Sequence, residues 1–287
     1  MERVDIAIVG SGPAGISAAL NAQIRHKSFY LFGSGNLSDK VQRSEQIANV
    51  PAIGVISGAE LNERFAKHID EAGITVTQKH ITGIYPMGDY FALLANQDDF
   101  YANSVILATG VETIKPLRGE REFLGRGVSY CATCDGNLYQ GKTIAVICDN
   151  APMEEEAAYL AGLAQKVYYL PLFQNSKLDA DHCERLSSPI VEILGDQRVS
   201  AIRCKDEQNI AVDGVFFLKH SISPAVLLTD LNMEQGHVAV DRHMATNIKG
   251  CFAAGDCTGT PYQITKSLGE GNIVAHAAFA YLAQQNR

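Results

Sequence analysis

Two stretches of the chain share one pattern, in which a continuous apolar run is followed by a short turn and then by a segment suited to a helix. The first stretch has its apolar run at residues 4–9 and its helical segment at residues 16–24. The second has them at residues 143–147 and 154–164. Mainly apolar runs of this length, in the first of which Asp5 is the one charged residue, are typical of parallel strands that are buried on both faces. The pattern predicts an α/β protein with two strand–turn–helix units.

The first turn reads Gly-Ser-Gly-Pro-Ala-Gly over residues 10–15. In a dinucleotide-binding turn, Gly10 permits the tight bend, Gly12 lets the backbone approach a pyrophosphate, and Gly15 lets helix and strand pack closely. An acidic residue that binds a ribose is expected after the second strand, but the chain has only Ser34 or Asn36 for that contact. The alternative is a glycine-rich turn without a ligand.

Composition and charge limit what the chain can do. Its 287 residues are enough for two domains, and 46% hydrophobic with 20% charged residues is typical of a soluble α/β protein. No apolar run is long enough to cross a membrane, and the first strand begins too early for a secretory signal. We therefore expect a cytoplasmic protein. The net charge of −8 gives no attraction to nucleic acid or to anionic lipid.

Only one pair among the seven cysteines, Cys131 and Cys134, is spaced for redox chemistry. An odd number of scattered cysteines argues against a disulfide scaffold. A Cys-x-x-Cys pair forms a disulfide that opens easily, and the adjacent carboxylate of Asp135 can move the proton that thiol–disulfide exchange requires. The alternatives are two buried cysteines or half of a zinc site. Because the chain offers no second ligand pair at suitable spacing, we expect no metal.

Two later segments extend the first unit. Residues 101–110 form a strand-like run that ends in Ala-Thr-Gly, and residues 250–256 form another that ends in Gly-Asp and precedes a helix. Together with the glycine-rich turn, these segments resemble the FAD domain of two-dinucleotide-binding-domain flavoproteins. The resemblance implies FAD as cofactor. It places the FAD contacts on Gly10, Ser11, Gly12, Pro13, Ala14, Gly15, Asn49, Ile81, Thr109, Gly110, Gly255, Asp256, Gln263 and Ile264, to which Ser34 is added for the ribose.

The hexapeptide Cys-Ala-Thr-Cys-Asp-Gly at residues 131–136 resembles the active site of low-molecular-weight thioredoxin reductases, and the likeness extends over nearly the whole chain. It implies that Cys131 attacks a thioredoxin-like protein, that Cys134 faces the flavin and that Asp135 moves protons. It also implies a homodimer and a relative movement of the domains. We expect two nucleotide-binding-type domains, the second inserted in the first. The FAD-binding domain would comprise residues 1–114 and 248–287, and the redox domain residues 115–247.

The turn of the second unit departs from the thioredoxin-reductase pattern. That pattern has glycines or small residues where this chain has Cys148, Asn150 and Met153. Pro152 removes a backbone N–H donor, and Asp149 places a negative charge where a phosphate would bind. These substitutions predict a degenerate NADPH-type fold.

A second departure points the same way, because residues 167–173 lack the arginines that bind the 2′-phosphate of NADPH. A flavin enzyme with a dithiol and no nicotinamide site is similar to the ferredoxin-dependent flavin thioredoxin reductases of anaerobic bacteria. That resemblance implies ferredoxin, or flavodoxin, as electron donor. Arg118, Arg121 and Arg126 are candidates for a basic docking patch on this acidic chain, with an ordinary solvated loop as the alternative.

Three other functions stay open at this point. The first is an NADPH-dependent thioredoxin reductase with a variant site; whichever function holds, a shifted nucleotide or a second flavin in the second groove also stays open. The second is a flavin-dependent dithiol oxidase, which would form peroxide rapidly from a dithiol in air. The third is a flavin-binding redox sensor, which would show no turnover with any disulfide.

Overall fold

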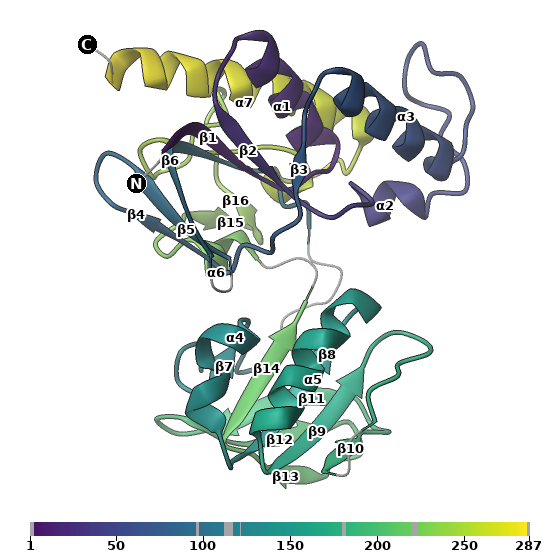
Figure 1. Cartoon of the computed structure of the whole chain (residues 1–287), viewed down its shortest axis with the longest axis vertical. Helices are drawn as coiled ribbons and strands as arrows, with labels where there is room; N and C mark the ends of the chain where they lie inside the picture. Colours follow the sequence, from purple (N-terminus) through teal and green to yellow (C-terminus); the bar gives the residue numbers. More distant parts are fainter. Residues whose placement is uncertain are drawn as a thin grey trace. The chain divides into compact units, whose positions relative to one another are not determined.

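The structure is a computed structural model that describes residues 3–95, 98–111, 117–120, 122–179, 182–219 and 223–285. The chain folds into two compact units. The discontinuous unit joins Met1–Val111 to Ser223–Arg287, and the inserted unit is Glu112–Ile222 (Figure 1). No helix in these described ranges combines the length and the apolar composition that crossing a membrane requires.

The discontinuous unit is built on a mixed sheet with the strand order β3-β2-β1-β6-β5-β4, in which β17 also pairs with β6. Its strands are β1 (Val4–Val9), β2 (Phe29–Phe32), β3 (Val76–Thr77), β4 (Gly83–Pro86), β5 (Phe91–Ala95), β6 (Asp98–Leu107) and β17 (Cys251–Ala253). The long β6 pairs with three strands: it is parallel to β1, its first half is antiparallel to β5, and its last three residues are parallel to β17. The β1 run is buried as predicted, with Ile6 and Ile8 fully inaccessible.

Helices cover this sheet, and α1 and α7 lie side by side (Figure 1). The helical elements are α1 (Pro13–Ile24), α2 (Asp39–Gln42), α3 (Gly58–Glu71), α6 (Pro224–Leu227), the 3-10 turn η3 (Asp256–Thr258) and α7 (Ile264–Gln285). A short hairpin pairs β15 (Met233–Glu234) with β16 (His237–Val238). α1 and α7 approach closely because Gly271 faces α1, where a Cβ would lie 2.3 Å from the Ala14 carbonyl oxygen.

The inserted unit has a parallel sheet with the order β10-β9-β8-β14-β7 and a separate antiparallel sheet, β11-β12-β13. Its strands are β7 (Val128–Ser129), β8 (Thr143–Cys148), β9 (Lys166–Pro171), β10 (Cys183–Arg185), β11 (Ile190–Gly195), β12 (Val199–Cys204), β13 (Asn209–Ala211) and β14 (Gly214–Leu218). Its helices are α4 (Ala132–Asp135), η1 (Gly136–Tyr139), η2 (Ala151–Met153) and α5 (Glu154–Leu163). The predicted α/β class with two strand–turn–helix units is confirmed.

The boundary at which the chain returns from the inserted unit to the discontinuous unit differs from the expected one. Residues 223–247 were predicted to belong to the inserted domain, whereas they fold as part of the discontinuous unit. There, Ala245 bridges to Phe252 of β17, and the Ala253 N–H donates to the Met244 carbonyl oxygen at 3.0 Å. The strands of this segment have only two residues each, too few to show a periodicity from which their partners could have been predicted.

Candidate functional site

Four strands of the discontinuous unit end at one edge of its sheet. β1 pairs with β2 and β6 as far as Val9, and β6 pairs with β17 as far as Leu107. The segments that follow these strands therefore begin close together, and Thr109 and Gly110 lie on one of them. Ligands of open α/β sheets bind outside the carboxyl ends of the strands. The sequence-predicted turn, the serine after β2 and the Gly-Asp after β17 all start at this edge.

The β1–α1 turn has the geometry that its three glycines predicted. Gly10 has a φ of +119°, and a Cβ there would lie 2.2 Å from the Ala108 carbonyl oxygen. A Cβ on Gly15 would lie 1.8 Å from the Gly10 carbonyl oxygen. At Gly12 the position is open, with Ser38 Oγ 3.9 Å from where a Cβ would be. The N-terminus of α1, which carries a partial positive charge, follows this open position directly.

Two serines lie where the adenosine end of a dinucleotide is expected. Ser11 Oγ donates to the Leu37 carbonyl oxygen at 2.8 Å, and a Cβ on Gly33 would lie 1.9 Å from this Oγ. Ser34 Oγ is buried and has no hydrogen-bond partner within the described part of the chain. Because buried hydroxyl groups normally have a partner, a ribose hydroxyl would complete this one.

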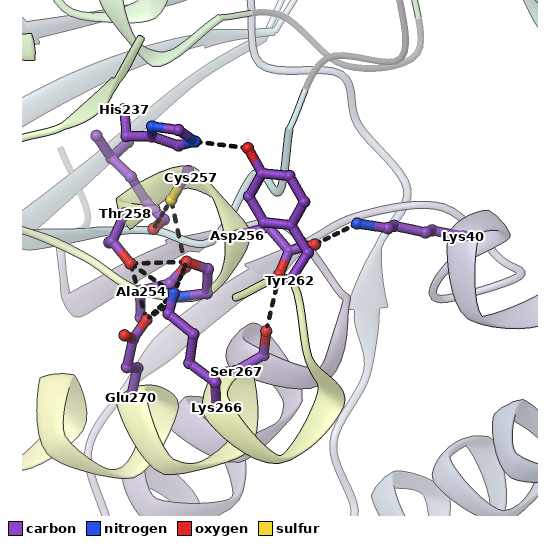
Figure 2. Close-up of polar contacts among 12 residues, drawn as sticks. Lys40, His237, Ala254, Asp256, Cys257, Thr258, Tyr262, Lys266, Ser267 and Glu270 are labelled. Carbon is purple, nitrogen blue, oxygen red and sulfur yellow. Dashed lines mark hydrogen bonds and ion pairs between the residues drawn. The ribbon is translucent and has the colours of Figure 1, made fainter. Parts of the chain in front are cut away.

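Asp256 is the first residue of η3, shortly after β17, and lies in a cluster of polar contacts. Figure 2 shows Lys40 and Ser267 pointing toward its carboxylate from α2 and α7. Lys40 Nζ forms an ion pair with Asp256 Oδ2 and lies 4.8 Å from the centroid of the Tyr262 ring. Ser267 Oγ donates to Asp256 Oδ1 at 3.4 Å. Tyr262 in turn places its hydroxyl 2.6 Å from His237 Nε2.

A network on α7 fixes the backbone that presents Asp256 (Figure 2). Glu270 Oε2 accepts from the Gly255 N–H at 2.8 Å and from the Thr258 hydroxyl at 2.9 Å. Lys266 Nζ donates to the Gly255 carbonyl oxygen at 2.8 Å and pairs with Glu270 at 3.1 Å. Neither charged residue was predicted from the sequence, although their i,i+4 spacing after the Gly-Asp strand was a usable signal.

The remaining predicted cofactor residues divide into polar and apolar contacts. Asn49 Nδ2 donates to Gln263 Oε1 at 2.7 Å, which joins two residues that lie far apart in the sequence. Ile81 is buried, and Ile264 packs against the small apolar cluster that includes Leu61.

The site fits FAD in three respects. It offers a helix N-terminus and open backbone at Gly12 for the diphosphate, a buried hydroxyl at Ser34 for a ribose, and a carboxylate at Asp256 for the ribityl chain. These three residues come from segments that only the fold brings together. Lys40 was missed because it lies on a helix of four residues that carries no motif.

In the inserted unit, Cys131 and Cys134 are joined by a disulfide with their Cα atoms 5.3 Å apart. Cys131 caps α4, and the Cys134 N–H donates to its Sγ at 3.1 Å. Cys131 is only 7% exposed, whereas Cys134 is exposed and Asp135 is half-buried at the end of α4. The family resemblance assigns the attack on substrate to Cys131, which is the less exposed of the two cysteines. As a disulfide, the pair is also not half of a zinc site.

The buried thiols of the discontinuous unit are poor nucleophiles. Burial raises the pKa of Cys257 to about 11 and that of Cys251 to about 12. Because the thiolate is the reactive form, thiols with such pKa values stay inert near neutral pH. Cys257 directly follows Asp256, and its Sγ donates to the Ala254 carbonyl oxygen at 3.3 Å, as expected for a residue that packs.

The β8–α5 turn of the inserted unit is closed by its own side chains. Asn150 Oδ1 accepts from the Met153 N–H at 3.1 Å and caps η2. Cys148 is fully buried, and its Sγ donates to the Asn150 carbonyl oxygen at 3.2 Å. α5 then begins with three consecutive glutamates, residues 154–156. These carboxylates oppose the attraction that a helix N-terminus exerts on phosphate.

The Glu154 carboxylate accepts most of its hydrogen bonds from the loop that follows β9. Its carboxylate accepts from Ser176 Oγ at 2.5 Å, from the N–H groups of Lys177 and Leu178 at 2.9 and 3.2 Å, and from Tyr169 Oη at 3.1 Å. Desolvation raises the pKa of Glu154, but these hydrogen bonds outweigh it and hold the pKa below its usual value. The first residue of α5 is thus an ionised side chain that stabilises the unit itself.

The arginines considered for docking a partner have intramolecular contacts. Arg118 Nε pairs with Glu192 Oε1 at 3.1 Å, and Arg126 Nη2 donates to the Glu122 carbonyl oxygen. Arg121 lies outside the described residues. Arg203 Nη1 pairs with the same Glu192 carboxylate at 2.5 Å, and the Arg118 side chain is 83% exposed.

Comparison with known proteins gives matches over both units. The family described as pyridine nucleotide-disulphide oxidoreductase matches residues 4–180 and 184–271. The thioredoxin reductase of Helicobacter pylori is 33% identical over 97% of this chain and 99% of that protein. A crystal structure of a ferredoxin-flavin thioredoxin reductase from Clostridium acetobutylicum is 47% identical with a TM-score of 0.91, covering 100% of this chain and 99% of the other. A thioredoxin reductase from Gloeobacter violaceus is 27% identical with a TM-score of 0.81, covering 99% of this chain and 96% of the other.

Proposed function

The chain belongs to the pyridine nucleotide-disulphide oxidoreductase family, and from this premise we propose that it is an FAD-dependent thioredoxin reductase that takes electrons from reduced ferredoxin instead of NADPH. The observation that carries the proposal is the closed β8–α5 turn, where Asn150 caps the turn and residues 154–156 place three carboxylates at the start of α5. The whole-length similarity to a ferredoxin-flavin thioredoxin reductase supports the same electron donor.

The discontinuous unit supplies the flavin site in this proposal. The β1–α1 turn binds the diphosphate through its backbone, Ser34 accepts from or donates to the adenosine ribose, and Asp256 binds the ribityl chain. FAD, when bound, accepts electrons singly from a one-electron carrier and passes them on as a pair. The network of Lys266 and Glu270 holds the Asp256 turn in place for that contact.

The dithiol carries the electron pair to the substrate. Two electrons and two protons convert the Cys131–Cys134 disulfide to two thiols, with Asp135 as the proton carrier. The Cys131 thiolate attacks the disulfide of a thioredoxin-like protein, and Cys134 then attacks the mixed disulfide, which releases reduced substrate and restores the starting bond. Because Cys131 is 7% exposed, its attack requires that the surroundings of the dithiol change between the two half-reactions.

Reduction by ferredoxin is favourable in energy. A plant-type ferredoxin near −400 mV and a thioredoxin near −270 mV differ by roughly 130 mV, which corresponds to about 6 kcal/mol for two electrons. The iron–sulfur cluster belongs to the partner in this scheme. Flavodoxin as an alternative donor, a homodimeric state and a cytoplasmic location stay predictions.

A coupled assay tests the proposal. Reduced ferredoxin, regenerated anaerobically, should drive thioredoxin reduction by the wild-type protein, and Cys134→Ser should lower the rate on the order of a thousandfold or more because the reactive pair is broken. Cys134→Ser should also accumulate a mixed disulfide between Cys131 and thioredoxin, whereas Cys131→Ser should not. Cys183→Ser, which changes a cysteine outside the disulfide in the same unit, is the control and should keep full turnover. Full thioredoxin reduction by Cys131→Ser would overturn the assigned roles.

A further inference from the structure

Two opposite charges lie in the interior of the inserted unit, and the proposed reaction does not use them. The side chain of Glu120 is 0% exposed and that of Lys219 is 2% exposed, and Lys219 Nζ lies 2.5 Å from Glu120 Oε1. Removing both ions from water carries a large desolvation penalty, which their attraction only partly offsets. A pair of this kind contributes little to net stability compared with apolar residues of the same size. The other groups that Glu120 and Lys219 contact are therefore the guide to what the pair does.

Among the described residues, Glu120 has two further side-chain hydrogen-bond partners. Its Oε2 accepts from the Leu117 N–H at 2.8 Å, and its Oε1 accepts from the Tyr130 hydroxyl. The Lys219 ammonium lies 4.5 Å from the centroid of the Phe217 ring and 5.5 Å from that of Tyr130. The carboxylate therefore ties Tyr130 to Lys219, and the aromatic faces help to solvate the buried cation.

Tyr130 directly precedes Cys131, so whatever fixes Tyr130 also fixes one end of the disulfide. Its ring stacks on Phe217 of β14, with centroids 5.6 Å apart. The preceding residue, Ser129, pairs with Phe216 of β14 in the parallel sheet, where Figure 1 shows β7 beside β14. Ser129 Oγ also accepts from the Cys131 N–H at 3.1 Å. The backbone leading into the dithiol is thus held by a strand ladder, a ring stack and the Glu120 carboxylate.

The pair also joins the two ends of the inserted unit. Glu120 lies near its first residue, Glu112, and Lys219 near its last, Ile222. The residues are 99 positions apart in the sequence. The contact therefore joins a residue from early in the unit's sequence to one from late in it, and Tyr130, which leads into the dithiol, binds the same carboxylate.

We propose that Glu120, Lys219 and Tyr130 position the Cys131–Cys134 dithiol and thereby set its disulfide–dithiol equilibrium. Two thiols held at bonding distance by a rigid frame have a high effective concentration, which favours the disulfide. When Tyr130 loses its anchor, the Cys131 end gains freedom, the disulfide becomes less favoured and the dithiol becomes a weaker reductant. The proposal rests on the proposed function only in that the Cys131–Cys134 bond opens and closes.

Tyr130→Phe tests this directly because it removes one hydroxyl and leaves the ring. The flavoprotein is equilibrated anaerobically in buffers of reduced and oxidised dithiothreitol, and free thiols are alkylated and counted by mass. We expect a threefold to tenfold smaller equilibrium constant for disulfide formation, which is a midpoint potential about 15 to 30 mV more positive. The matched control is Tyr169→Phe, because Tyr169 is fully buried in the same unit and its hydroxyl donates to a different glutamate, Glu154. The control should stay within about twofold of wild type.

A second matched pair uses neighbouring residues of β14. Phe217→Leu removes the ring under Tyr130 and should move the equilibrium in the same direction as Tyr130→Phe. Phe216→Leu removes the ring that packs on Tyr139, with centroids 5.1 Å apart, and should lower the melting temperature without moving the equilibrium. An unchanged equilibrium in both Tyr130→Phe and Phe217→Leu would overturn the proposal, as would an equal shift in Tyr169→Phe. Neither ferredoxin nor thioredoxin is present, so these outcomes are independent of the proposed donor and substrate.

Discussion

The turn after β1 and the turn after β8 start from the same arrangement of strand and helix and differ in what fills the space before the helix. After β1, Gly10 and Gly15 bring strand and helix together, and the open position at Gly12 faces no side chain closer than 3.9 Å within the described part of the chain. After β8, Asn150 caps the turn and Glu154 binds the neighbouring loop. The first turn needs a ligand to complete its contacts, whereas the second has completed them within the chain.

This difference teaches that a nucleotide-binding fold can be kept for a different purpose. α5 no longer offers its N-terminus to phosphate, but Thr133 Oγ1, within the Cys-x-x-Cys motif, donates to Glu156 Oε2 at 3.3 Å. Glu154 anchors the loop after β9 at the same time. The sheet and helix of the inserted unit therefore act as the frame of the dithiol.

The largest effect is expected at the open turn. Gly10→Ala forces a Cβ to within 2.2 Å of the Ala108 carbonyl oxygen at a φ of +119°, so the variant should lose about 3 kcal/mol or more of stability. It should purify without flavin absorbance. Gly269→Ala is the control, because this α7 position has open space around it, and it should keep its flavin and gain about 0.5–1 kcal/mol. A yellow, stable Gly10→Ala protein would contradict the close approach seen in the turn.

At the closed turn, Glu154→Ala removes the acceptor for the loop donors and should destabilise the inserted unit by about 2 kcal/mol. Because the pKa of Glu154 is lowered in the folded state, its contribution is fully present above the unfolded-state pKa and is lost as pH falls through the folded-state pKa. The stability difference between wild type and variant should thus narrow below about pH 4.3. Urea unfolding of wild type and variant at pH 7 and pH 3.5 measures this difference in stability. Glu155→Ala, one residue along and exposed, should cost little at either pH.

A smaller loss is expected when the cap of the closed turn is removed. Asn150→Ala deprives the Met153 N–H of its acceptor and should cost about 1 kcal/mol, whereas Asn150→Ser keeps an acceptor and most of the stability. Hydrogen exchange of the β8 and α5 amides reports the change. Neither variant should become reducible by NADPH, because the carboxylates at the start of α5 remain. NADPH-driven turnover in either one would show that the cap alone had closed the site.

The smallest effect concerns the loop that bears Arg118. Its ion pair with Glu192 leaves the arginine side chain 83% exposed, so Arg118→Ala should change stability by no more than about 0.5 kcal/mol. Charge reversal with Arg118→Glu should leave ferredoxin-driven turnover within about twofold of wild type. A tenfold loss with a steeper dependence on salt would instead identify this loop as the docking site.

The sequence predicted the parts of the fold that rest on continuous apolar runs. β1, β6 and β8 are strands of six or more residues with fully buried side chains, and each was expected from its residues. The return of the chain to the discontinuous unit at Ser223 was not predicted, because β15 and β16 have only two residues each. Short elements leave no periodicity to detect.

For the site, residues within motifs were predictable and residues that meet by folding were not. Gly10 and the dithiol could be identified from local spacing, and Asp256 from the resemblance of its segment to a known FAD domain. Lys40 reaches Asp256 across 216 positions, and Lys219 reaches Glu120 across 99, so neither pairing leaves a trace in the local sequence. From the sequence alone, charged residues such as these are predicted to lie on the solvated surface, and only the fold shows their partners.

The central claim, that one turn serves a flavin and the other no longer serves a nicotinamide nucleotide, is tested most directly by anaerobic bleaching of the flavin absorbance. One cuvette receives excess NADPH and the other receives reduced ferredoxin. We predict bleaching by ferredoxin and an unchanged spectrum with NADPH over the same time. Prompt bleaching by NADPH would contradict the claim, because it would mean that the β8–α5 unit still binds the nucleotide.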